Sequence, residues 1–158
     1  MEGNNGTTLI VISGDMDKVF AAFSIAVGAA SAGKETNMFF TFWGLKAIQK
    51  GNLTGKSIFG RMMGLLNRGG INRIGPSRFN FGGLGRWIFK FMMKAHQVTS
   101  LEELRKTAIE LGVKLYPCET SMRVMEISKE DLIDGVAEPC GVATMLEMSD
   151  RSHQTLFI

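Results

Sequence analysis

Two kinds of apolar pattern alternate along the chain and predict its secondary structure. Nearly continuous apolar and β-branched runs are typical of strands in a buried parallel sheet, and they occupy residues 7–13, 37–42, 113–116, 135–137 and 155–158. Apolar positions at helical spacing occur between these runs, at residues 17–31, 101–111, 122–127 and 139–148. The alternation predicts an α/β fold, a three-layer α/β/α sandwich with a five-stranded parallel sheet, formed by residues 1–158 as one domain.

The ends of the predicted helices carry recognisable capping residues. Ser100 and Glu103 have the spacing of a capping box, which places the start of a helix at residue 101. Gly33 and Gly112 follow helical segments at the position where a left-handed residue commonly ends a helix. The helix at 17–31 has few polar positions, so we expect it to be largely buried.

The segment from 51 to 95 has a different texture, because glycine recurs throughout it between apolar residues. So many glycines exclude a long regular helix, and the apolar content excludes a plain disordered linker. Two short helices near Ile58–Leu66 and Leu84–Met93, joined by a glycine-rich loop, fit the pattern best. The second is basic and aromatic, as membrane-surface helices are. A flap at an oligomer interface or a mobile lid explains the same residues, and we favour that interpretation.

The charge distribution sharpens this contrast. No Asp or Glu occurs from Thr36 to Leu101, whereas ten of the eighteen Lys and Arg residues lie there. The remaining eight bases are outnumbered by all fifteen acids, so an acidic body carries a basic middle segment. Such a segment supports one alternative function, a non-catalytic oligomeric interaction protein that docks on an acidic partner or a membrane surface through its basic middle segment. Nucleic acid or nucleotide binding is the weakest alternative, because the chain has no GxGxxG, P-loop or nucleic-acid motif.

The two cysteines do not indicate a disulfide framework in a chain of 158 residues. They are too far apart for a CxxC motif, and with only two His we expect no metal site and no cofactor. The N-terminus lacks a basic leader region, and the apolar run from Thr8 to Ile12 is too short to span a membrane. We therefore expect a cytoplasmic protein.

Cys118 lies between the strand that ends at Pro117 and the helix predicted from Met122, which Thr120 and Ser121 open. The unpaired N–H groups at a helix start carry partial positive charge, and this favours a thiolate. The position therefore predicts an accessible, reactive sulfur. A small buried apolar cysteine is the alternative.

The carboxyl edge of a parallel sheet is where ligands bind in such folds. The prediction collects one set of candidates at that edge: Gly14, Asp15, Trp43, Gly44, Cys118 and Cys140. Asp15 is more simply explained as a helix cap. Cys140 follows Pro139 at a predicted helix start, so it is a resolving thiol, a second acceptor or a packed side chain. The backbone N–H groups of Thr120 and Ser121, or the Ser121 hydroxyl, are candidates for stabilising a sulfur anion.

Three stretches resemble one known family. They are Phe39–Leu45, Cys118–Met125 and Gly141–Met145 with the terminal Leu156–Ile158, together with Gly14-Asp15 after the first strand. They resemble the DsrE/DsrF/DsrH-like superfamily, in its second DsrE-type subfamily, over essentially the whole chain. The resemblance implies a single DsrE-like domain with a basic insertion at about 51–95.

The same resemblance implies a function. It suggests a homo-oligomeric sulfur-trafficking protein, a persulfide carrier or sulfurtransferase, with Cys118 as the carrier residue and rhodanese-like and TusA-like proteins as partners. This chain has Glu126 where family members usually have Gly. That acid, and Glu119 beside the sulfur, are expected to oppose thiolate formation.

Overall fold

A four-stranded parallel sheet forms the centre of the computed structural model, which describes residues 5–158. Its order is β3-β2-β1-β4, from strands β1 (Gly6–Val11), β2 (Thr36–Phe40), β3 (Lys114–Pro117) and β4 (Ser152–Phe157). These four strands are joined by three pairings, β1 with β2, β1 with β4 and β2 with β3, and all three are parallel. The first four residues, where the sequence predicts no leader, lie outside the described part of the chain.

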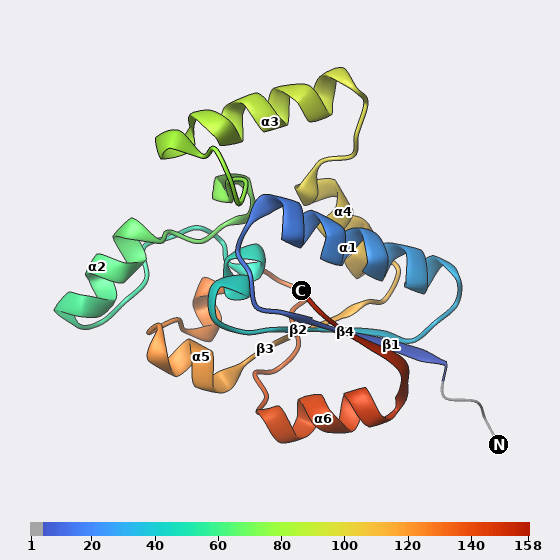
Figure 1. Cartoon of the computed structure of the whole chain (residues 1–158). Helices are drawn as coiled ribbons and strands as arrows, with labels where there is room; N and C mark the ends of the chain where they lie inside the picture. Colours follow the sequence, from blue (N-terminus) through green and yellow to red (C-terminus); the bar gives the residue numbers. More distant parts are fainter. Residues whose placement is uncertain (1–4) are drawn as a thin grey trace.

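Helices cover both faces of the sheet, as the sequence predicts (Figure 1). Helices α1 (Met16–Ser31) and α4 (Leu101–Glu110) pack against each other on one face. The shorter α5 (Glu119–Val124) and α6 (Val142–Asp150) lie on the other face. The described part of the chain also contains four 3₁₀ turns, η1 (Phe42–Ile48), η2 (Ile71–Arg73), η3 (Phe81–Gly83) and η4 (Lys129–Asp131).

The prediction of a strand at residues 135–137 is wrong, so the sheet has four strands in the described part of the chain and not the predicted five. Residues 135–137 run beside β3 but form only one isolated bridge, between Leu115 and Val136. Gly135 has a φ of +84°, a left-handed conformation that interrupts an extended chain immediately before the bridge. The segment is therefore too short and too bent to pair as a strand.

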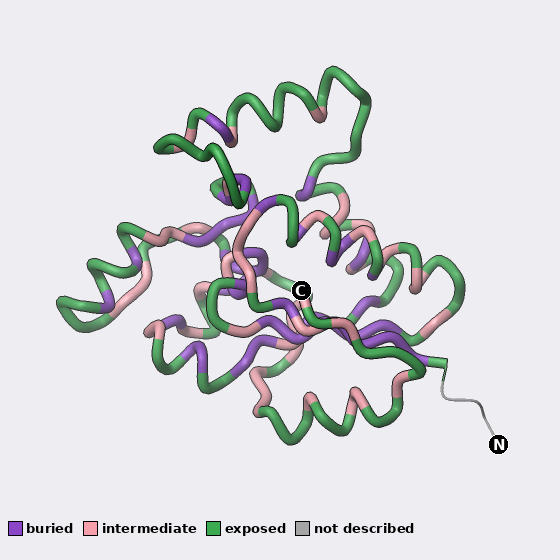
Figure 2. The backbone as a smooth tube through the Cα atoms, in the orientation of Figure 1, coloured by how far each residue is buried: buried purple, intermediate pink, exposed green. Residues whose placement is uncertain are grey.

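The core lies between the sheet and α1, where Leu9, Phe23, Phe40 and Leu115 are fully buried. The rings of Phe23 and Phe40 pack with centroids 6.0 Å apart. The prediction that α1 is largely buried holds only for one face, because Ile25 and the charged side chains are exposed. Figure 2 shows buried residues concentrated on β1 and β2 and on the side of α1 that faces the sheet, whereas β4 has no buried residue.

The segment from 51 to 95 contains two helices that project from the sandwich, α2 (Ile58–Leu66) and α3 (Leu84–Ala95) (Figures 1 and 2). The predicted limits of α2 are confirmed, and α3 runs two residues beyond its predicted end. α2 contacts the rest of the chain through Gly60 and Gly64, its two buried residues. Its large apolar side chains therefore face outward, and Ile58 is 88% exposed.

Candidate functional site

Cys118 is the N-cap residue of α5, directly after β3. The helix begins at Glu119, three residues earlier than the sequence predicts, so the cysteine touches the helix start more closely than expected. Its backbone N–H donates to the Phe40 carbonyl (2.8 Å), and its carbonyl accepts from Met122 N–H (3.0 Å). These bonds fix the residue between the end of β2 and the first turn of α5.

The prediction of an exposed sulfur is wrong, because the Cys118 residue is only 3% exposed. The chain around Cys140 runs alongside it: the two cysteines form an isolated parallel bridge. Cys140 N–H donates to the Pro117 carbonyl and Glu119 N–H donates to the Cys140 carbonyl, each at 3.0 Å. This strand-like pairing was not foreseen from the sequence.

The buried sulfur nevertheless lies among hydrogen-bond donors. Burial by itself raises the pKa of Cys118, but the Ser121 hydroxyl, the Ser121 N–H, the Thr41 hydroxyl and the Thr120 N–H surround the sulfur and together hold its pKa below that of an ordinary thiol. The Thr41 and Ser121 hydroxyl oxygens are 2.7 Å apart, and Ser121 is 1% exposed. We call these two side chains the hydroxyl pair.

The hydroxyl pair has two protons to distribute. Each hydroxyl carries one proton and accepts with its lone pairs, so one can donate to the sulfur while the other donates between the two oxygens. Either arrangement supplies the sulfur with a donor that is itself held by a partner. Thr41 was missed by sequence analysis, although its position at the end of β2, the strand next to β3, was the available signal.

Cys140 differs from Cys118 in both position and acidity. The helix predicted to begin near it begins instead at Val142, with Gly141 as N-cap, so Cys140 does not lie at a helix start. Burial, and the neighbouring Cys118, raise the pKa of the half-buried Cys140 thiol. Of the two cysteines, Cys118 is therefore the one that ionises first.

The two acids expected to oppose the thiolate are directed elsewhere. Glu119 pairs with Arg123 on the exposed side of α5 (2.6 Å). Glu126 reaches the start of α2, where its carboxylate accepts from Ser57 N–H (2.7 Å) and from Lys56 N–H. Its φ of +50° is a conformation that favours glycine, the residue that the family resemblance leads us to expect at this position. Neither acid is among the groups that shift the pKa of Cys118.

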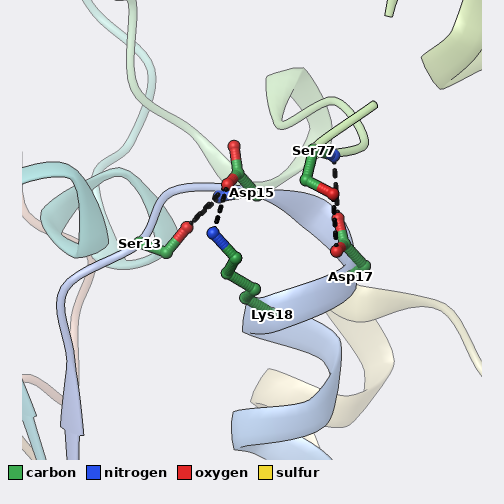
Figure 3. Close-up of polar contacts among 5 residues, drawn as sticks. All are labelled: Ser13, Asp15, Asp17, Lys18 and Ser77. Atoms are coloured by element: carbon green, nitrogen blue, oxygen red, sulfur yellow. Dashed lines mark hydrogen bonds and ion pairs between the residues drawn. The ribbon is translucent and has the colours of Figure 1, made fainter. Parts of the chain in front are cut away.

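The remaining candidates form a second group at the same sheet edge. Gly14 and Gly44 allow close backbone contact: a Cβ on Gly44 would lie 2.1 Å from the Val11 carbonyl oxygen, and one on Gly14 would lie 2.6 Å from that of Trp43. Asp15 is the N-cap residue of α1, but its side chain does not cap. It accepts instead from Ser13 (2.9 Å) and Lys18 (3.0 Å) (Figure 3).

Trp43 is 45% exposed and lines a cavity of about 410 Å³ with Gly14, Asp15 and Lys46. The structure thus brings Cys118, Thr120, Ser121 and Cys140 together, and places Gly14, Asp15 and Trp43 in a separate cavity.

Within residues 5–158, no three His, Cys, Asp or Glu side chains are arranged to hold a metal ion. No helix in that range combines the length and the apolar character needed to cross a bilayer.

Comparisons with known proteins identify relatives that match this chain over nearly its whole length. The protein YrkE of Bacillus subtilis (strain 168) is 36% identical over 159 residues, which cover 99% of each chain. The sulfur carrier protein DsrE2 of Allochromatium vinosum is 30% identical over 154 residues, covering 95% of this chain and 96% of that protein.

Two solved structures share the fold. The YchN protein of E. coli has a TM-score of 0.55 at 12% identity, with 97% of this chain and 99% of that chain covered. The MTH1491 protein of Methanobacterium thermoautotrophicum has a TM-score of 0.53 at 10% identity, with 96% and 97% covered. The model of the DsrE/DsrF/DrsH-like family matches residues 3–157, and the chain belongs to that family.

Proposed function

We propose that this protein is a sulfur carrier in which Cys118 holds the transferred sulfur as a persulfide. The observation that carries the proposal is that the hydroxyl pair and the first amides of α5 surround the buried Cys118 sulfur and lower its pKa. The name of the related sulfur carrier protein DsrE2 supports the same class of function. A structural cysteine would gain nothing from donors that favour its anion.

The transfer needs two displacements and no external oxidant. The Cys118 thiolate attacks the outer sulfur of a donor persulfide, a new S–S bond forms, and the donor leaves as its thiolate. An acceptor thiolate then attacks the outer sulfur on Cys118, and the Cys118 thiolate is released. Repeated with donor and acceptor proteins, these steps are sulfurtransferase activity. Rhodanese-like donors and TusA-like acceptors fit this chemistry.

Cys140 fits best as a bystander kept protonated. A thiolate there would attack the inner sulfur of the Cys118 persulfide, form a disulfide and release hydrosulfide, so the carried sulfur would be lost. The raised pKa of Cys140 slows that reaction at neutral pH, because the thiol is a much weaker nucleophile than the thiolate.

The burial of Cys118 makes access part of the proposal. A donor sulfur must touch the Cys118 sulfur, so the segment around Cys140 or the short α5 has to move during transfer. α5 has only six residues, and the bridge to Cys140 is isolated, so this movement breaks few backbone hydrogen bonds. We expect partner docking, and assembly into a homo-oligomer, to control this opening.

Sulfur loading tests the proposal directly. The reduced protein is incubated with inorganic polysulfide, freed of the reagent and analysed by intact and peptide mass spectrometry. We expect one added sulfur atom on the peptide that holds Cys118, complete loss of that mass in Cys118→Ser, and retention in Cys140→Ser. Loading of Cys140 alone, or of both cysteines equally, contradicts the assignment.

A second candidate role is supported by the outward apolar faces of α2 and α3. Trp87 and Phe91 stack on the exposed side of α3 at 6.1 Å, and Phe59 of α2 is 76% exposed. Because no acid occurs between Thr36 and Leu101, all the charged side chains of the segment that carries these two helices are basic. We propose that the two helices dock on an anionic membrane surface, since two copies meeting through this face would repel each other.

Liposome flotation distinguishes this role from sulfur transfer. The protein is expected to float with vesicles containing phosphatidylglycerol and to remain unbound with phosphatidylcholine alone. Trp87→Ala combined with Phe91→Ala should abolish flotation, whereas Val142→Ala, which removes an exposed apolar side chain on α6, should not. Flotation that is insensitive to salt and to the helix variants refutes the docking role.

A further inference from the structure

A second cavity, of about 300 Å³, lies between the β1–α1 turn and the basic middle segment. Three arginines from three parts of that segment reach it, and we call it the arginine cavity. Its polar lining residues are Asp15, Lys46, Arg68, Arg73, Asn80 and Arg86.

The arginine cavity carries positive charge that the protein does not balance. Within residues 5–158, none of the three arginines has a carboxylate oxygen within 4.0 Å. The one acid in the described lining is Asp15, and its carboxylate is already paired with Lys18 at 3.0 Å. Guanidinium groups gathered around a cavity without a counterion repel one another, so an anion bound there would be stabilised.

Two of the guanidinium groups are held in place by the backbone. Arg86 donates from Nη1 to the Arg73 carbonyl, and Arg68 donates from Nε to the Gly51 carbonyl, each at 2.8 Å. Among the described residues no acceptor engages their other N–H groups, so each keeps donors in a fixed planar fork. A fork of this kind matches the spacing of oxygens on a phosphate group.

Lys46 adds a partly desolvated ammonium to the same cavity. Its side chain is half-buried, and a Cβ on Gly14 would lie only 2.9 Å from its Cδ. Burial lowers the pKa of Lys46, and Asp15 offsets this only in part. An anion in the cavity would restore the stabilisation that this ammonium lost on leaving water.

The wall of the cavity is a glycine-rich loop fastened to the start of α1. The Ser77 N–H and hydroxyl donate to the two oxygens of the Asp17 carboxylate, each at 2.8 Å (Figure 3). The Met16 N–H donates to the Gly75 carbonyl at 2.8 Å. These bonds hold the loop against the positive end of a 16-residue helix, which adds a favourable dipole for an anion.

We propose that the arginine cavity binds a tetrahedral oxyanion of the phosphate class, held by Arg68, Arg73 and Arg86. The cavity lined by Trp43 adjoins it and shares four lining residues with it, Gly14, Asp15, Lys46 and Leu66. This neighbouring space leaves room for an apolar or aromatic group attached to that anion. The site is separate from Cys118 and does not depend on the sulfur-carrier proposal.

Calorimetric titration with inorganic phosphate, at low ionic strength in a buffer without oxyanions, tests the site. We expect saturable binding with one site per chain, weakened about tenfold or more in Arg73→Gln, because a charge-assisted hydrogen bond is lost. Arg73→Lys keeps the positive charge but not the planar guanidinium group, so its affinity for phosphate should lie between that of the wild type and that of Arg73→Gln. Arg78→Gln is the matched control: Arg78 is exposed on the same loop and does not line the cavity.

Vesicles distinguish a soluble anion from a lipid headgroup. If phosphatidic acid vesicles bind the wild-type protein but not Arg73→Gln, and free phosphate binds neither, the ligand is a lipid headgroup. Binding of free phosphate that Arg73→Gln weakens identifies a soluble ligand. The proposal is refuted if neither probe binds in an Arg73-dependent way while circular dichroism shows that Arg73→Gln is folded. Cys118→Ser should bind phosphate as the wild type does, whatever the outcome of sulfur loading.

Discussion

Removing the Ser121 hydroxyl isolates the interaction on which the chemistry of Cys118 depends. Ser121→Ala deletes one of the donors that lower the pKa of the Cys118 sulfur and also leaves Thr41 without its partner at 2.7 Å. The backbone N–H of residue 121 stays in place, so the helix start is preserved. Because Ser121 is 1% exposed, water does not replace the lost donor.

The expected size follows from the energy of a charged hydrogen bond. Such a bond contributes about 1.5–3 kcal/mol, which corresponds to a thiolate fraction about 10 to 100 times smaller at a pH below the pKa. A more basic thiolate is intrinsically more nucleophilic. The logarithm of the rate constant therefore falls by only about half as much as the logarithm of the thiolate fraction. The rate constant for alkylation of Cys118 should therefore fall about three- to tenfold.

The assay is the rate of iodoacetamide labelling of the Cys118 peptide, measured by mass spectrometry in the Cys140→Ser background. Thr120→Ala is the matched control, because it also lies on the first turn of α5 but contributes only its backbone N–H to the sulfur. The control should react within twofold of the parent. Equal rates for Ser121→Ala and Thr120→Ala would refute the role given to the hydroxyl.

Three further predictions concern acidity, the start of α2 and backbone contact. As pH rises, labelling of Cys118 should level off before that of Cys140, because hydrogen bonds lower the first pKa and burial raises the second; the reverse order contradicts the assignment. Glu126→Gly should speed hydrogen exchange at the first amides of α2 about tenfold and leave Cys118 labelling within twofold, whereas unchanged exchange would show that the carboxylate does not hold the helix. Gly44→Ala should lower the free energy of unfolding in urea by about 1–3 kcal/mol or more, because its Cβ meets a β1 carbonyl, whereas the open position of Gly28→Ala in α1 should raise it by about 0.5–1 kcal/mol.

Features set by neighbouring residues could be predicted from the sequence. The Ser100–Glu103 capping box is present in full, and both of its reciprocal hydrogen bonds form. Gly33 and Gly112 adopt positive φ at the ends of α1 and α4. The parallel sheet followed from continuous apolar runs, because such strands must be covered on both faces. These signals act within a few residues and need no tertiary context.

Features set by distant residues could not be predicted. The partner of Ser121 is Thr41, eighty positions away, so neither the burial nor the acidity of Cys118 is visible in its own segment. Glu126 looked like a charge beside the sulfur until the fold directed it to α2. The strand expected at residues 135–137 failed because only one bridge forms beside β3. The arginine cavity likewise appears only when the middle segment wraps against the β1–α1 turn.

A carrier must release sulfur as well as accept it, and a chase experiment measures both. Cys118 is loaded with isotopically labelled sulfane sulfur, the donor is removed, and a small thiol acceptor is added. The account predicts that the label leaves as the outer sulfur, that Cys118 returns to a free thiol, and that Cys140→Ser changes neither. Label that stays on the protein, or that leaves only as a disulfide joins the two cysteines, would contradict it.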